Sequence, residues 1–165
     1  VTMLFAAFTS AYIVRRSGSD WADIPLPAVL WLNTIVLGAS SLALEGGRYF
    51  GEHRRWSLAN AAFALALSLG VAFLWGQAAA WRQLQAAGIY LPANPSSSFF
   101  YMMTAAHAVH VVAAIIVLAR ATLLTWQGLG QRQFRTWAAS IGLCRTFWHF
   151  LFAVWVYLFA FISIF

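Results

Sequence analysis

Residues 57–81 read SLANAAFALALSLGVAFLWGQAAAW and contain no charged side chain. A helix that crosses a membrane needs about 20 consecutive and mainly apolar residues, and this stretch is longer than that. A run of about 10 to 14 apolar residues would be more typical of a helix in the core of a soluble domain. The stretch therefore predicts a transmembrane helix.

Further apolar stretches lie on both sides of it. Residues 28–47, 98–125 and 137–165 are also long enough to cross a membrane. Residues 1–14 would form a helix of only about 21 Å at 1.5 Å per residue, shorter than the hydrocarbon core of ~30 Å, so we expect its start to be embedded or to lie upstream. We predict an all-α fold with a single transmembrane domain over residues 1–165, built as a bundle of five transmembrane helices.

The composition supports the same class of protein. The chain is 62% hydrophobic and 8% charged, whereas soluble domains carry about 25% charged residues. The net charge is +6, and all ten basic residues are arginines. These arginines lie mostly between the apolar stretches, which indicates contact with lipid headgroups rather than with nucleic acid.

The distribution of arginines predicts the orientation. Connections 15–27 and 82–97 hold three arginines together with Asp20 and Asp23. Connections 48–56 and 126–136 hold six with their flanks, namely Arg48, Arg54, Arg55, Arg120, Arg132 and Arg135. Because cytoplasmic loops are enriched in arginine, we expect a cytoplasmic N-terminus and a C-terminus outside. Tryptophans at 56, 81, 126 and 137 bracket the spans at the expected headgroup level.

Polar side chains inside the spans are the candidate functional residues. His107 and His149 would lie roughly 14–18 Å deep, and His110 shares a helix face with His107. We interpret these histidines with Asn33 as a structural polar network. A haem held by His149 and one other histidine is an alternative, as is a proton relay or a metal site. We expect no intramembrane carboxylate beside the histidines.

Charged residues near the ends of the spans suggest further contacts. Glu45 lies three residues before Arg48, a spacing that predicts an ion pair at the helix end. Arg120 and Arg145 would reach the cytoplasmic interface or bind the phosphate of a lipid. The single cysteine, Cys144, cannot form an intrachain disulfide and is expected to be a packing residue.

Several segments resemble a known family. Residues 99–111, FFYMMTAAHAVHV, are similar to the F-Y-x-x-T-x-x-H-x-x-H-V segment of cytochrome c oxidase subunit III. Residues 147–159, FWHFLFAVWVYLF, resemble the family's Y-W-H-F segment and the V-W that follows it. Asn33-Thr34 resembles its L-N-T segment, and residues 3–12 resemble the preceding helix. In the family's order, these segments correspond to the last five of seven helices.

The resemblance implies an accessory, non-redox subunit of a proton-pumping aa3-type oxidase in a bacterial plasma membrane. It implies no catalytic residue and no cofactor in this chain, with haem and copper in partner subunits I and II. The chain would support assembly, retain phospholipid and aid proton uptake by subunit I. Three acidic positions of the family correspond to Val1, Gly142 and Phe152, so no carboxylate role is carried over.

Other functions remain open at this point. Similar subunits accompany quinol oxidases and nitric oxide reductases, and the residues do not separate these from cytochrome c oxidase. An independent b-type cytochrome would use His149 with His107 or His110. A small transporter is disfavoured, because the sequence shows no internal repeat.

Overall fold

The computed structural model describes residues 2–18, 21, 24–91 and 94–164. The regular elements among these residues are all helices, which confirms the all-α prediction. The helices are α1 (Thr2–Arg16), α2 (Val29–Glu52), α3 (Trp56–Ala86), α4 (Pro95–Trp126), α5 (Leu129–Arg132) and α6 (Phe134–Ile164). The predicted span ends at Val1 and Phe165, and the aspartates Asp20 and Asp23, lie outside the described residues.

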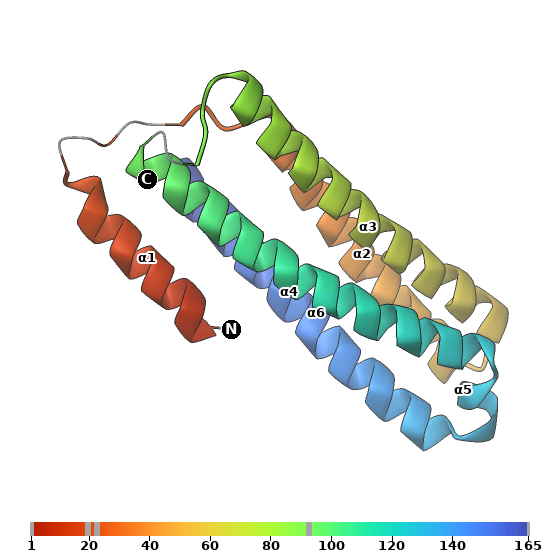
Figure 1. Ribbon diagram of the computed structural model, residues 1–165. Coiled ribbons are helices and arrows are strands. Elements are labelled where there is room, and N and C mark those ends of the chain that lie inside the picture. The colour runs from red at the N-terminus through yellow and green to blue at the C-terminus, as the bar shows by residue number, and fades with distance from the viewer. Residues whose placement is uncertain (1, 19–20, 22–23, 92–93, 165) are drawn as a thin grey trace.

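Four of these helices, α2, α3, α4 and α6, are long and apolar enough to cross a membrane. They form a four-helix bundle in which α2 packs against α3 and α6, and α4 packs against the same two helices (Figure 1). Consequently α3 and α6 lie diagonally across the bundle. Helix α1 has 15 residues and does not meet the length for a span, so the fifth span stays a prediction.

The two ends of the bundle carry different connections. The turn from α2 to α3 and the segment around α5 lie at one end (Figure 1). The end of α1, the end of α3, the start of α4 and the end of α6 lie at the other. The connections that share an end of the bundle are the same ones that the arginine count places on one side of the membrane. Which side is cytoplasmic stays a prediction.

Helix limits differ from the predicted ones where polar side chains extend a helix. Helix α2 continues to Glu52 rather than ending at residue 47, because Arg48 pairs with acids three and four residues away. Helix α4 begins at Pro95 rather than at residue 98, because Asn94 caps it. The Asn94 Oδ1 atom accepts a hydrogen bond from the backbone N–H of Ser97 at 2.8 Å. Helix α5 was not predicted.

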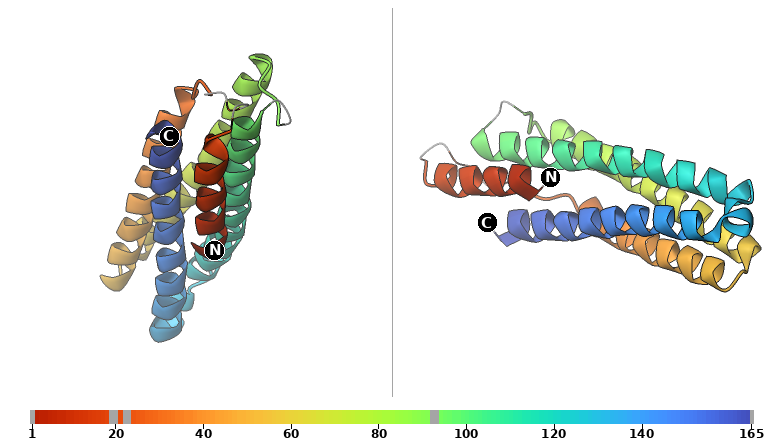
Figure 2. Two further views of the ribbon diagram at one scale, coloured as in Figure 1. Left: turned by 90° about the vertical axis from the view of Figure 1, so that its left-hand side faces the viewer. Right: turned by 90° about the horizontal axis from the view of Figure 1, so that it is seen from below.

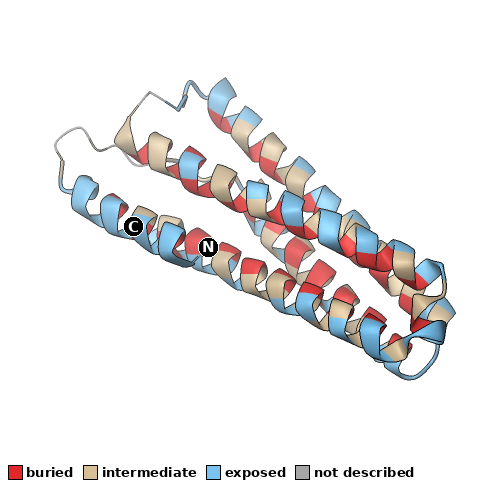
Figure 3. Cartoon of the chain, turned by 60° about the horizontal axis from the view of Figure 1, so that its bottom comes forward, coloured by how far each residue is buried: buried red, intermediate tan, exposed pale blue. Residues whose placement is uncertain are grey.

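The core follows the inward faces of the four long helices, and Figure 3 shows buried positions recurring along each helix between exposed ones. Helix α1 packs on the outside of this bundle, alongside α4 and α6 (Figure 2). Its Phe5 and Tyr12 form a second, smaller cluster with Met103, Leu158 and Phe161. The N-terminal end of α1 lies near the middle of the bundle's length.

Candidate functional site

His107 lies in the interior of the bundle and joins α4 to α6. Its side chain is fully buried, and its Nε2 donates a hydrogen bond to the carbonyl oxygen of Leu151 at 3.0 Å. The imidazole ring packs beside Trp155 and Phe73, with centroids 5.2 and 5.7 Å away. Its Nδ1 has no hydrogen-bond partner among the described residues. This geometry supports a link between helices.

His110 lies one turn further along α4 and makes a different contact. Its Nδ1 donates to the carbonyl oxygen of Ala106 in its own helix at 2.7 Å. The ring also lies 5.9 Å from that of Phe5 in α1. His110 therefore faces the surface that α1 covers.

Asn33 bonds α2 to α3 rather than to the histidines. Its Nδ2 donates to the carbonyl oxygen of Phe73 at 3.3 Å. The side chain is buried and lies directly against Gly76. A methyl group at Gly76 would overlap the Asn33 amide, so the glycine permits this close contact.

His149 lies with an acid from a different helix. Its Nε2 donates to Glu45 Oε1 at 2.6 Å, which joins α6 to α2. Arg145, one turn earlier in α6, places its Nε 3.4 Å from the same oxygen. The expectation that no intramembrane carboxylate would accompany the histidines is therefore wrong. It failed because Glu45 was assigned to the helix end, whereas α2 continues for seven further residues, to Glu52.

Arg48 completes the charged group. Its Nε lies 3.3 Å from Glu45 Oε2, and its Nη1 lies 2.9 Å from Glu52 Oε1. The four side chains of Arg48, Glu45, Glu52 and Arg145 are each about one-third to two-fifths exposed, at 35–40%. We call Glu45, Arg48, Glu52, Arg145 and His149 the charged cluster.

The three histidines thus bond to three different acceptors, on α6, α4 and α2 respectively. No hydrogen bond between them is found in the described parts of the chain. Arg120 is exposed on α4, and within those same parts it makes no ion pair with Glu45. The lipid role suggested for Arg120 and Arg145 stays a prediction.

Three tryptophans form contacts that the sequence reasoning missed. Each donates its indole N–H to a threonine hydroxyl on another helix, in the pairs Trp81–Thr104 (3.1 Å), Trp137–Thr125 (2.9 Å) and Trp155–Thr34 (3.0 Å). Position along a span indicates the depth of a tryptophan but does not reveal which helix its indole faces. A buried indole needs an acceptor, and these threonines supply it.

Comparison with known proteins gives the family. The family model described as cytochrome c oxidase subunit III matches residues 2–165. The chain belongs to the cytochrome c oxidase subunit III family. A probable cytochrome c oxidase subunit 3 of Mycobacterium tuberculosis is 30% identical over 168 residues, which cover 95% of this chain and 78% of the relative.

Two further relatives carry similar names. Cytochrome c oxidase subunit 3 of Corynebacterium diphtheriae is 28% identical, with 95% of this chain and 78% of the relative covered. That of Synechocystis is 25% identical, covering 94% of this chain and 67% of the relative. Membership in the subunit III family, together with four apolar helices, makes the chain a membrane protein that forms a complex with other oxidase subunits.

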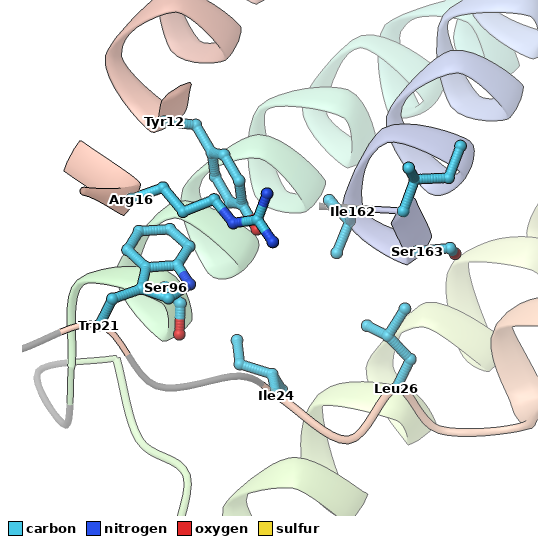
Figure 4. Close-up of a pocket in the computed structure, with 9 residues that line it drawn as sticks. Tyr12, Arg16, Trp21, Ile24, Leu26, Ser96, Ile162 and Ser163 are labelled. Atoms are coloured by element: carbon cyan, nitrogen blue, oxygen red, sulfur yellow. The ribbon is translucent and has the colours of Figure 1, made fainter. Parts of the chain in front are cut away.

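This subunit III chain also contains a pocket at the end of the bundle where α1 ends. Its volume is about 230 Å³, and Tyr12 and Arg16 extend toward it from α1, with Ser96 of α4 and Ser163 of α6 nearby (Figure 4). Within the described residues, no group of three His, Cys, Asp or Glu side chains is placed to hold a metal ion.

Proposed function

We propose that this chain is an accessory, non-redox subunit III of an aa3-type cytochrome c oxidase in a bacterial plasma membrane. The family match over residues 2–165 carries this proposal. The relatives named as subunit 3 are bacterial proteins, which supports the location. The chain would bind beside subunits I and II, which would hold the haem and copper.

The contacts of the histidines support a structural role for them. His107 and His149 each form a hydrogen bond to another helix through one ring nitrogen. Such bonds fix the relative positions of α2, α4 and α6. A rigid bundle of this kind would support assembly and proton uptake by subunit I without taking part in electron transfer.

The same proposal gives the chain five spans, a cytoplasmic N-terminus and a C-terminus outside. The arginine-rich connections lie together at one end of the bundle, which supports this orientation (Figure 1). Helix α1 would be the first span and would cross only part of the membrane within the described residues.

Lipid retention belongs to the proposal as well. Arg120 is exposed on α4, six residues before the helix ends at Trp126. Its long side chain could extend to the headgroup level and bind a phosphate there. Arg145 is held at the level of Glu45 by their ion pair. Of the two arginines, Arg120 is therefore the better candidate for a lipid ligand.

A spectrum of the copurified complex tests the proposal. The chain would be tagged, purified in mild detergent, and a reduced-minus-oxidised spectrum recorded. We expect the signal of a-type haem, together with partner subunits identified by mass spectrometry. A complex with only b- and c-type haem would instead indicate a quinol oxidase or a nitric oxide reductase.

A second preparation distinguishes the proposal from an independent cytochrome. Expressed alone with haem available, the chain is expected to bind none. A sharp Soret band that disappears in a His149→Ala variant would contradict the accessory role.

A further inference from the structure

Glu45 and Arg145 of the charged cluster lie below the level of the tryptophans at this end of the bundle. Trp137 and Trp56 pack edge to face with centroids 5.3 Å apart, and tryptophans favour the headgroup level. Gly51 contacts the Trp137 ring so closely that a side-chain carbon there would overlap it. Glu45 lies six residues deeper than Gly51 along α2, and Arg145 lies eight residues deeper than Trp137 along α6. At 1.5 Å per residue, both are roughly 9–12 Å below this level.

Charges at this depth need hydrogen-bond partners, because hydrocarbon offers none. Glu45 and Arg48 have theirs within the cluster. Arg145 does not, since its Nε approaches Glu45 at 3.4 Å without forming a hydrogen bond. In the described parts of the chain, no acceptor bonds to its two terminal nitrogens. The side chain is 35% exposed on the outer face of the bundle, so an acceptor can reach it from outside.

A groove of about 550 Å³ runs beside Arg145 between α2 and α6. Ala138, Gly142 and Thr146 line it at intervals of four residues, so small side chains follow one face of α6. A side-chain carbon added at Gly142 would meet nothing within 4 Å. Leu143 borders the groove and is 77% exposed. Small residues at this spacing let a second helix approach closely in a membrane.

The charge balance of the cluster indicates the chemistry of the missing acceptor. The positive charges of its two arginines and the negative charges of its two glutamates cancel. A phosphate or carboxylate would therefore add an uncompensated negative charge in hydrocarbon, which is costly. An uncharged oxygen, such as a side-chain amide, a hydroxyl or a free backbone carbonyl, would satisfy Arg145 without that cost.

We infer that the α2–α6 groove binds a transmembrane helix of another oxidase subunit, and that this helix presents an uncharged oxygen acceptor to Arg145. The inference rests on the proposed function, because the helix must come from a subunit of the same complex. The depth of Arg145 favours a helix over a lipid headgroup, whose phosphate lies at the surface. The small residues of α6 provide the close contact and Arg145 provides the polar one.

Photocrosslinking in the intact complex tests this inference. A benzophenone amino acid would replace Leu143 beside the groove or, as a control, Leu65 on α3, which is 52% exposed on the diagonally opposite helix. We expect the Leu143 probe to form an adduct with a transmembrane peptide of a copurified oxidase subunit, and the Leu65 probe to form none with that peptide.

The possible outcomes separate the inference from the proposed function. If oxidase subunits copurify but the Leu143 probe captures only lipid, detergent or a second copy of this chain, the inference is wrong and the proposed function stands. If no oxidase subunit copurifies at all, both are wrong.

A steric variant provides a second test. Gly142→Leu extends a side chain into the groove from a position where an added Cβ meets nothing within 4 Å, and Ala61→Leu places a leucine at an exposed position on α3. We expect Gly142→Leu to reduce the amount of retained partner subunits about tenfold. A tenfold reduction corresponds to ~1.4 kcal/mol, the size of one interhelical contact. Ala61→Leu should leave retention unchanged. Equal retention in both variants would overturn the inference.

Discussion

Glu45 and His149 stand 104 positions apart in the chain, and their Oε1 and Nε2 atoms lie 2.6 Å apart. The contact joins α2 to α6, the first and last of the four long helices. Arg145 and Arg48 approach the same carboxylate. Glu45 thus accepts hydrogen bonds from His149 and Arg48 and forms an ion pair with Arg145.

Replacing Glu45 with glutamine should destabilise the bundle. The change keeps the shape but removes the charge that two arginines and His149 share, so we expect a loss of about 1–3 kcal/mol. The measurement is the midpoint of thermal unfolding in mild detergent. Glu52→Gln is the matched control, because among the described residues the ion pair of Glu52 is with Arg48 of its own helix. An equal decrease in both variants would argue against the central position of Glu45.

Replacing His107 with leucine should loosen α4 from α6. The variant loses the hydrogen bond to the Leu151 carbonyl, with an expected cost of about 1–2 kcal/mol, and should associate less with partner subunits. His110→Leu is the control, because its hydrogen bond stays within α4. A His107→Leu protein that remains fully assembled and equally resistant to heat would contradict the structural role.

Replacing Gly76 with alanine should separate α2 from α3. The added methyl overlaps the Asn33 side chain, and overpacking of this kind costs about 1–3 kcal/mol. In the control, Gly46→Ala, the new carbon meets only Phe50 at an ordinary 3.9 Å. The test compares the unfolding midpoints. A Gly76→Ala chain as stable as Gly46→Ala would show that Asn33 can move aside freely.

Replacing Arg120 with alanine should reduce bound phospholipid. Attraction to an anionic headgroup contributes about 1 kcal/mol per arginine, which corresponds to roughly fivefold weaker retention. Native mass spectrometry of the purified complex would count the lipids. Arg135→Ala near the start of α6 is the control. Unchanged lipid in the Arg120 variant would remove this residue as a ligand.

The apolar stretches were enough to predict the four long helices, because a span must be long and mainly apolar. They also identified α1 as too short. The exact ends of the helices were harder to predict, since they depend on single side chains. The cap at Asn94 starts α4 early, and the ion pairs of Arg48 prolong α2.

The candidate site was harder to predict, because depth along a helix does not say which helix lies opposite. His107 and His149 have similar calculated depths, which suggested that they meet. The packing places both α2 and α4 beside α6, and His149 bonds to Glu45 of α2 rather than to His107 of α4. The order of the spans along the chain does not reveal that α2 packs against α6, because α3 and α4 separate the two helices in the sequence.

The pairing of Glu45 with Arg145 also affects how the chain enters the bilayer during synthesis. An arginine in the middle of an isolated helix raises the cost of insertion by roughly 2.5–3.5 kcal/mol. Helix α2 is made before α6, since chains emerge from the ribosome N-terminus first. The acid is therefore already in the membrane when Arg145 and His149 arrive, so the earlier helix lowers the insertion barrier of the last one.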